Sequence, residues 1–175
     1  MKYNTFKRLS YLRSLIQSVK ILLLSVGKQH DVYVQQGVDD FTKRINKYFI
    51  AAWQLIAPPK NAASLSENEL KKQEGKLILQ ALQQEDVLIL LDERGKQWSS
   101  IALADFVQQK TVESKKRLVF LIGGAFGVDE HVFHRANYTW SLSNLVFPHM
   151  LVRLVLSEQL YRACTIIRNE KYHHV

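Results

Sequence analysis

The last third of the chain holds two segments whose residue types could form a ligand pocket. In the first, an apolar run over Leu118–Ile122 leads directly into the glycine-rich segment Gly123–Gly127. Glycine adopts positive φ angles and lets a ligand approach the backbone closely. A tight turn between a strand and a helix explains the same glycines equally well. The chain contains neither GxGxxG nor GxxxxGK followed by Ser or Thr, so the common dinucleotide and nucleoside triphosphate fingerprints are absent.

The second segment, Ser141–Pro148, alternates apolar side chains with small polar ones. Such a segment can offer backbone N–H and C=O groups to the edge of an adenine, while its apolar side chains enclose the ring. An ordinary buried strand has a similar pattern. Taken alone, the segment therefore leaves both interpretations open.

The C-terminal end of the chain combines guanidinium, aromatic and imidazole side chains. Arg153 and Arg162 lie on a predicted helix, and Tyr172, His173 and His174 follow it. Arginine can pair with phosphate, aromatic rings stack on bases, and histidine moves a proton near neutral pH. A frayed terminus explains the tail on its own, so its interpretation depends on the rest of the chain.

Metal and hydrolase sites are not indicated. His131 and His134 are three residues apart, but no Cys, Asp or Glu set completes a metal site at the usual spacing, so we expect surface histidines. No GxSxG segment occurs, and the chain has no cysteine–histidine pair with a plausible base. The single cysteine, Cys164, is expected to be a small buried apolar side chain and fits a reducing cytosol.

The charge of the chain is unevenly distributed. The net charge of the 175 residues is +8, and residues 1–19 supply four basic groups and no acidic one. Apolar residues recur there at helical spacing, which predicts either an amphipathic basic helix or a poorly ordered extension. The rest of the chain is only mildly basic, so charge alone favours nucleic acid and a solvated surface equally. No apolar run approaches the roughly 18 residues of a membrane span.

Apolar runs alternate with segments of helical periodicity from Lys20 onward. The predicted strands are Lys20–Val26, Ile50–Ala57, Asp86–Leu91 and Arg117–Ile122, with a fifth strand or extended segment at Trp140–Phe147. We expect a turn over Asp92–Gly95 to end the third strand. Strands that are apolar throughout and alternate with helices predict an α/β fold whose mostly parallel sheet is flanked by helices.

The helices between these strands show recognisable start signals. Ser66 and Glu69 form a capping box. The helix that it opens should turn four residues inward, namely Leu70, Leu77, Ile78 and Ala81. Ser99 or Ser100 caps the next helix, another begins near Asp129, and the last runs from Pro148 to about Arg168.

The last helix is apolar on nearly all sides at its start, over Met150–Leu156. A helix of this kind is buried on all sides. Because it is the final element of a small domain, the pattern predicts a subunit interface, and therefore a homodimer. A helix that is merely central in the fold is the alternative.

The order of four segments resembles the RlmH family of methyltransferases. They are LLDERGKQW (Leu90–Trp98), FLIGGAFG (Phe120–Gly127), SLSNLVFPHMLVRLVLSEQLYRA (Ser141–Ala163) and the terminal Tyr-His-His. The resemblance covers about residues 20–174 and implies the SPOUT architecture, an α/β fold with a deep C-terminal trefoil knot. It implies one domain over residues 20–175, preceded by a basic extension at 1–19 without a family counterpart.

The resemblance also implies a function. Members of the family methylate N(3) of a pseudouridine in 23S ribosomal RNA, with S-adenosylmethionine as donor, as cytoplasmic homodimers that need neither metal nor membrane. The positions that match the family's cofactor pocket are Leu91, Gly123, Gly124, Leu142, Ser143, Asn144, Leu145, Val146, Phe147 and Pro148.

Residue chemistry suggests roles in catalysis for the C-terminal groups. A base or a cation that stabilises the imide anion should help the transfer. We expect His173 to act as base, Arg153 or Arg162 to stabilise the anion, and Tyr172 to stack on the target. Two alternatives are the same fold acting on another RNA such as tRNA, and a ribosome-binding module without catalysis. The glycines and the Ser141–His149 segment argue against the second, because a mere binder needs no cofactor pocket.

Overall fold

The computed structural model describes residues 19–28 and 31–172. The predicted extension before Val19 and the predicted base His173 lie outside the described residues, as does His174. Val19 itself is fully buried and belongs to the core. The folded unit therefore includes Val19.

One five-stranded sheet organises the chain, with strand order β2-β1-β4-β3-β5. Every neighbouring pair runs parallel. The strands are β1 (Lys20–Val26), β2 (Ile50–Ile56), β3 (Val87–Gln97), β4 (Arg117–Ile122) and β5 (Tyr138–Ser141). The prediction of a parallel sheet is confirmed, and its first four strands begin within one residue of the predicted positions.

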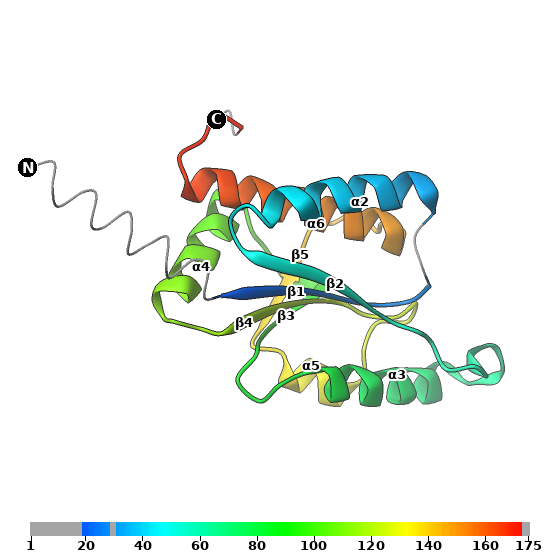
Figure 1. Cartoon of the computed structure of the whole chain (residues 1–175). Coiled ribbons are helices and arrows are strands. Elements are labelled where there is room, and N and C mark those ends of the chain that lie inside the picture. The colour runs from blue at the N-terminus through cyan, green and yellow to red at the C-terminus, as the bar shows by residue number, and fades with distance from the viewer. Residues whose placement is uncertain (1–18, 29–30, 173–175) are drawn as a thin grey trace, which may run out of the picture.

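Helices cover both faces of the sheet (Figure 1). One face carries α2 (Val32–Ile45), α4 (Ser100–Val112) and α6 (His149–Ile167); the other carries α3 (Glu67–Ala81) and α5 (Glu130–Arg135), and a short 3-10 turn, η1 (Ala62–Ser64), precedes α3. Successive residues of each central strand point to opposite faces, so Leu23 and Phe120 join one buried cluster while Leu24 and Leu121 join the other. The result is three layers with a core on each side of the sheet.

The helix starts follow the predicted signals. The Ser66 side chain accepts a hydrogen bond from the backbone N–H of Glu69, whose carboxylate accepts one from the N–H of Ser66. Ser99 caps α4 and Asp129 caps α5 in the same way. These caps satisfy backbone donors that a helix start leaves without an internal partner.

Three local predictions are wrong. Strand β3 does not end at a turn over Asp92–Gly95 but continues to Gln97, because β5 pairs with it again after an irregularity between Leu91 and Lys96. Gly95 permits this, since a Cβ there would lie 2.7 Å from the backbone nitrogen of Trp140. Conversely, β5 ends at Ser141, earlier than predicted. Leu77 does not face inward; it is among the exposed apolar side chains.

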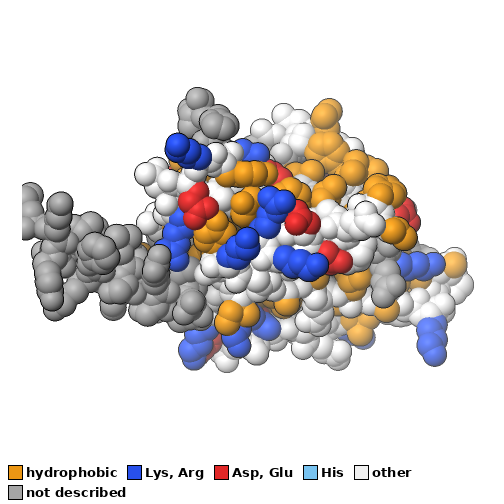
Figure 2. Space-filling model, turned by 45° about the horizontal axis from the view of Figure 1, so that its top comes forward, with side chains coloured by type: hydrophobic (Ala, Val, Ile, Leu, Met, Phe, Trp, Pro, Cys, Tyr) orange, Lys and Arg blue, Asp and Glu red, His pale blue; other side chains and the backbone are white. Residues whose placement is uncertain are grey.

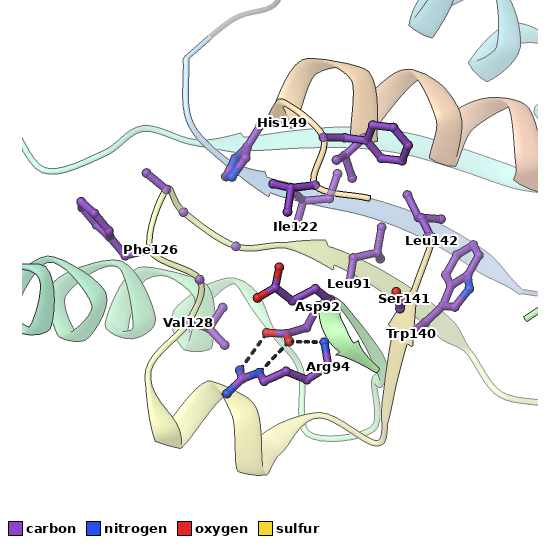
Figure 3. Close-up of a pocket in the computed structure, with 18 of the residues that line it drawn as sticks. Leu91, Asp92, Arg94, Ile122, Phe126, Val128, Trp140, Ser141, Leu142 and His149 are labelled. Carbon is purple, nitrogen blue, oxygen red and sulfur yellow. Dashed lines mark hydrogen bonds and ion pairs between the residues drawn. The ribbon is translucent and has the colours of Figure 1, made fainter. Parts of the chain in front are cut away.

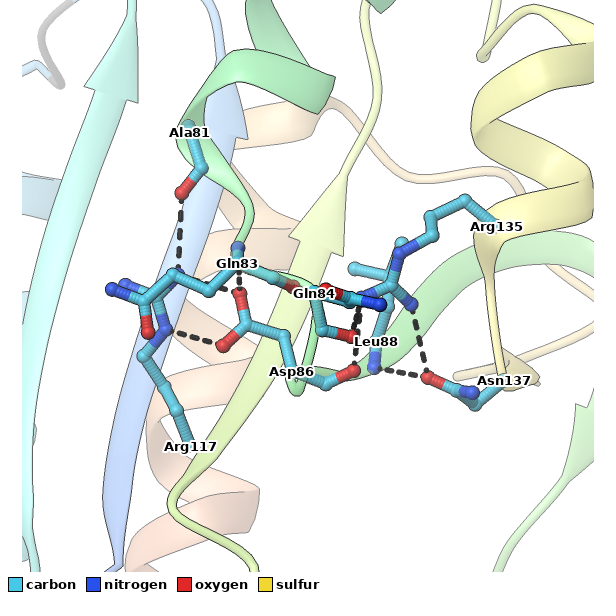
Figure 4. Close-up of polar contacts among 8 residues, drawn as sticks. All are labelled: Ala81, Gln83, Gln84, Asp86, Leu88, Arg117, Arg135 and Asn137. Atoms are coloured by element: carbon cyan, nitrogen blue, oxygen red, sulfur yellow. Dashed lines mark hydrogen bonds and ion pairs between the residues drawn. The ribbon is translucent and has the colours of Figure 1, made fainter.

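The amino ends of β3, β4 and β5 are fastened by a polar cluster, here called the amino-edge network (Figure 4). Asp86, a buried carboxylate, accepts hydrogen bonds from the guanidinium of Arg117 and from the N–H of Gln83. Arg135 donates to the carbonyls of Gln83, Gln84 and Asp86, and Asn137 accepts from the N–H of Leu88. The buried carboxylate of Asp86 and the partly exposed groups around it therefore all have partners.

Helices α2 and α6 pack closely. A Cβ at Gly37 would lie 2.7 Å from a methyl carbon of Leu154, so a larger residue there would force the Leu154 side chain to move. Cys164, farther along α6, is buried, and burial raises the pKa of its thiol to about 12. This confirms the prediction that it behaves as a small apolar side chain. The trefoil knot implied by the family resemblance concerns the path of the loops after β3, β4 and β5, and it stays a prediction.

Candidate functional site

A pocket of about 480 Å³ lies at the carboxyl ends of β3, β4 and β5 (Figure 3). Parallel α/β sheets commonly bind ligands at this edge. The pocket brings together segments far apart in sequence: the end of β3, the loop after β4, and the chain between β5 and α6. Eight of the predicted cofactor residues line it, namely Leu91, Gly123, Gly124, Leu142, Ser143, Leu145, Val146 and Phe147. Asn144 and Pro148 were also predicted but are not among its lining residues.

The glycine-rich loop forms one wall. Gly124 and Gly127 exchange two backbone hydrogen bonds, which closes a tight turn over Ala125 and Phe126. Gly127 has a φ of +81°, a conformation that side chains disfavour. The interpretation of these glycines as a turn is therefore correct, and the turn also lines the pocket.

A buried acid lies directly behind this wall. Glu74 of α3 is only 4% exposed. A Cβ added to Gly124 would lie 2.1 Å from a carboxylate oxygen of Glu74. A side chain at position 124 would therefore have to displace the Glu74 carboxyl, in addition to filling the ligand space that the sequence suggested.

The opposite wall is the chain after β5. The Ser141 hydroxyl donates to the carbonyl of Ser143, whose own hydroxyl accepts from the N–H of Leu145. Asn144 accepts a hydrogen bond from Gln97 at the end of β3, 2.7 Å away. These bonds hold the loop in an irregular, non-helical shape that presents backbone to the pocket. Asn144 thus contributes by fastening the loop.

Charged groups of both signs surround the pocket. Arg94 donates two hydrogen bonds to the carboxylate of Asp92, and these hold the pKa of Asp92 below its usual range despite burial, which acts in the other direction. Glu93 and Lys71 also line the space. The Arg94 guanidinium lies 5.0 Å from the Phe133 ring centre. A zwitterionic ligand would find partners for both of its charges here.

His149 enters the pocket from the start of α6, across from Asp92 and Arg94 (Figure 3). Burial, and next the nearby charge of Arg153, lower its pKa, so its imidazole is uncharged at neutral pH. Trp140 closes the inner end. Its ring stacks on Trp98 at 5.3 Å, and its indole N–H has no hydrogen-bond partner within the described part of the chain.

The family model described as "Predicted SPOUT methyltransferase" matches residues 19–173, nearly the whole chain. The chain belongs to the SPOUT methyltransferase family. A protein named ribosomal RNA large subunit methyltransferase H from Cytophaga hutchinsonii is 45% identical over 156 residues, covering 89% of this chain and 100% of the relative. A protein of the same name from Flavobacterium johnsoniae is 44% identical, covering 89% and 99%. The expected resemblance is thus confirmed.

A solved structure of a probable methyltransferase from Bordetella pertussis aligns with a TM-score of 0.48 at 10% identity, and the alignment covers 89% of this chain and 99% of that one.

The predicted catalytic residues of this SPOUT methyltransferase do not gather at the pocket within one subunit. Arg153 is buried behind it, where its guanidinium donates to Ser25 and to the carbonyls of Val26 and Lys28. Arg153 therefore ties α6 to the end of β1. Burial lowers the pKa of this guanidinium, but arginine still stays charged at neutral pH.

Arg162 and Tyr172 lie together at the far end of α6. The guanidinium of Arg162 pairs with Glu158 at 2.6 Å and lies 4.9 Å from the Tyr172 ring centre. Tyr172 also packs edge-on against Tyr161. A helix rises about 1.5 Å per residue, so Arg162 lies roughly 20 Å along α6 from His149.

Sequence reasoning missed five residues of the site. Asp92 was interpreted as part of a turn, and Trp140 as a strand residue; Glu74, Phe126 and His149 were given no role. His149 stands within the Pro-His segment that carried the resemblance, which was a usable signal. The sequence gave no such signal for Glu74, because a single glutamate on an amphipathic helix looks like a solvent-exposed residue. In residues 19–28 and 31–172, no group of three His, Cys, Asp or Glu could hold a metal ion, and His131 and His134 are exposed as predicted.

Proposed function

We propose that the protein transfers a methyl group from S-adenosylmethionine to N(3) of a pseudouridine in 23S ribosomal RNA. The observation that carries this proposal is the pocket: the segments that match the family's cofactor site come from three separate parts of the chain and meet around one cavity. The relatives at 44–45% identity are named large-subunit ribosomal RNA methyltransferases, which supports the choice of RNA.

The pocket suits the donor on chemical grounds. Its floor and walls are mostly backbone and apolar side chains, and Leu91, Leu142 and Phe147 can enclose a flat ring. Acidic and basic side chains stand at the other end, as an amino acid moiety needs. S-adenosylmethionine supplies a methyl group activated by a sulfonium. The protein mainly has to align the acceptor nitrogen with that methyl and exclude water.

The acceptor nitrogen carries a proton that must leave. Arginine stabilises an imide anion by charge, and a histidine near its ordinary pKa can take the proton. Arg162, Tyr172 and His173 are the groups that we assign to this step, with Tyr172 stacking on the exposed base. Arg153, held at β1, contributes positive charge behind the pocket.

In a homodimer, Arg162 and Tyr172 of one subunit could lie close to the pocket of the other. If α6 packs antiparallel against α6 of a second copy, the far end of one helix reaches the pocket of the other. Large apolar side chains near the pocket are exposed in the single chain, above all Leu145, Val146 and Leu151. Figure 2 shows hydrophobic side chains gathering on the side of the molecule where α2 and α6 begin. A monomeric protein rarely leaves such a surface uncovered.

The interface can be tested by light scattering, with an expected mass near twice 20.3 kDa. Sequence reasoning offered Val152 or Leu156 as sites for a disruptive charge. Leu156 is buried within the subunit, so a charge there would unfold the chain instead. Leu151→Asp is the better variant, and Ile101→Asp, exposed on α4, is its matched control. A wild-type protein that stays monomeric at micromolar concentration would refute the dimer.

The RNA target can be tested directly. Ribosomes from a strain without this enzyme should accept a methyl group at one pseudouridine, mapped by mass spectrometry. We expect intact ribosomes to react far better than protein-free RNA at physiological salt, because a mildly basic body holds naked RNA weakly. Methylation of tRNA instead of ribosomal RNA would favour the alternative in which the same fold acts on another RNA. Donor binding without any product on RNA would favour a non-catalytic module.

Deleting Tyr172–Val175 separates the tail from the pocket. We expect this variant to bind S-adenosylmethionine normally and to lose methylation. Full activity in the variant would show that the tail neither reads RNA nor moves the proton. We further propose that the protein works in the cytoplasm, where bacterial ribosomal RNA, the substrate named for its relatives, is found. No described helix is long and apolar enough to cross a membrane.

A further inference from the structure

Glu74 is an acid without a partner next to the donor pocket. It is 96% shielded from solvent on α3, where the neighbouring Gly75 lets the helix pack against Asp129. Among the described residues, Glu74 has no hydrogen-bond or ion-pair partner, although buried carboxylates normally have such partners. Since a buried carboxyl without partners costs stability, a functional role would explain why Glu74 occupies this position.

The position of Glu74 points to the pocket. Its carboxylate lies against Gly124, and Gly124 lines the cavity with Gly123 and Ala125. Gly124 has no side chain, so only the thickness of one backbone strand separates the carboxylate from a ligand. Lys71, one turn earlier on the same helix, lines the cavity as well. The α3 face that carries Glu74 is therefore part of the pocket's surroundings.

The other charges near the pocket do not neutralise Glu74. Asp92 is paired with Arg94, and Glu93 is exposed. Asp129 caps α5 and has His131 beside it at 3.4 Å. Burial raises the pKa of Glu74, and no charged neighbour acts against it. Burial therefore works against the carboxylate form, and a cation in the pocket would favour it.

We propose that Glu74 is a specificity-determining residue that makes the pocket prefer the positively charged donor over its uncharged product. The inference rests on the proposed use of S-adenosylmethionine. The donor carries a sulfonium, and S-adenosylhomocysteine carries a neutral thioether after the methyl is lost. A buried carboxylate behind a thin backbone wall attracts the first and not the second, so transfer of the methyl group itself weakens the hold on the product.

The proposal makes donor binding depend on protons. If the donor drives Glu74 from acid to carboxylate, binding releases a proton. Donor affinity then rises with pH until Glu74 is ionised in the empty protein as well, whereas product affinity stays flat. Calorimetry of the full chain between pH 5.5 and 7.5, in buffers that differ in ionisation enthalpy, measures the protons released with each ligand. Release with S-adenosylmethionine, and none with S-adenosylhomocysteine, is expected.

Glu74→Gln removes the charge while keeping the shape. We expect donor affinity to fall about tenfold, the equivalent of one pKa unit, with product affinity within about twofold and proton release abolished. Glu67→Gln, at an exposed acid of the same helix that does not line the pocket, is the matched control and should change neither ligand appreciably. Glu74→Asp should restore part of the preference. The other titratable residues at the pocket are unchanged in these variants, so a proton signal lost only in Glu74→Gln identifies Glu74.

Each result decides the matter. Equal losses for donor and product in Glu74→Gln would mean that Glu74 only supports the loop, and would overturn the proposal. If the wild-type protein bound S-adenosylmethionine without releasing a proton, the proposal would also be overturned. This test needs no variant, so it holds even if Glu74→Gln fails to fold. If the wild-type protein does not bind S-adenosylmethionine at all, the proposed function fails and not merely the role of Glu74.

Discussion

The two edges of the sheet treat polar groups in opposite ways. At the amino edge, Asp86, Arg117, Arg135 and Asn137 pair with one another or with backbone (Figure 4). At the carboxyl edge, Glu74 and the indole N–H of Trp140 lack partners among the described residues, and Val146 is 83% exposed. Unmet hydrogen bonds and uncovered apolar surface cost stability but leave capacity for ligands. The amino edge thus holds the fold together, and the carboxyl edge is prepared for binding.

The largest effect on stability should come from breaking the amino-edge network. Asp86→Ala leaves the guanidinium of Arg117 without its buried carboxylate, which typically costs about 3–5 kcal/mol. Denaturant unfolding measures this. The neighbouring Glu85–Lys116 ion pair is exposed at both ends, so Glu85→Ala should cost within about 0.5 kcal/mol. Comparable losses in the two variants would mean that the network is not what fastens this edge.

Substitutions at the carboxyl edge should mainly change the affinity for S-adenosylmethionine. In Gly124→Val the added side chain collides with the Glu74 carboxyl, so Glu74 or the glycine loop must shift, and S-adenosylmethionine affinity should fall at least about 100-fold, or about 2.7 kcal/mol. Ala52→Val, which adds a β-branched side chain at an exposed position of β2 outside the pocket lining, is the matched control. That control should bind within about threefold of wild type. Calorimetry on both folded variants provides the comparison, and unchanged affinity in Gly124→Val would contradict the site.

A smaller effect is expected from Arg94→Ala, and it should depend on pH. Arg94 lowers the pKa of Asp92, so the pair stabilises the fold above the unfolded pKa of about 3.9 and loses this contribution as pH falls through the lower folded value. Because Arg94 is largely exposed, the variant should cost only about 0.5–1 kcal/mol at pH 7. The free energies of unfolding of the wild type and of Arg94→Ala should therefore converge as the pH falls from 7 to 3. A cost that is the same at every pH would point to lost packing on Phe133.

The smallest effect should follow from removing residues 1–18. The family model begins at residue 19, and Val19 already belongs to the core. We expect the shortened chain to keep its stability and to methylate ribosomes within about twofold of the full chain. A large loss of methylation with intact donor binding would instead assign the basic extension a role in holding RNA.

Much of the fold was predictable because its signals are local. The runs Lys20–Val26 and Arg117–Ile122 are apolar throughout, and such runs between helices form buried parallel strands. Ser66, Ser99 and Asp129 cap helices through bonds that span three residues. The cofactor segments were found from their order in the chain, which the family resemblance supplied. No long-range geometry was needed for any of these predictions.

The errors and omissions concern contacts between distant residues. Asp92–Gly95 has the composition of a turn, and only pairing with β5 makes it a strand. Leu77 follows the helical period, yet the narrow surface of α3 that meets the sheet leaves it exposed. Arg153 and Arg162 stand nine residues apart in sequence, but one ties down β1 and the other faces Tyr172.

By itself, the sequence determined the parallel α/β architecture, the helix starts and the family, because apolar runs, caps and motif order are written in neighbouring residues. Only the tertiary structure decided that Glu74 lies behind Gly124, that His149 faces Asp92 and Arg94, and that Arg162 stands far from the pocket. Those relations arise when separate strands and helices close on one another, and the energy of such contacts depends on three-dimensional proximity that no local pattern encodes.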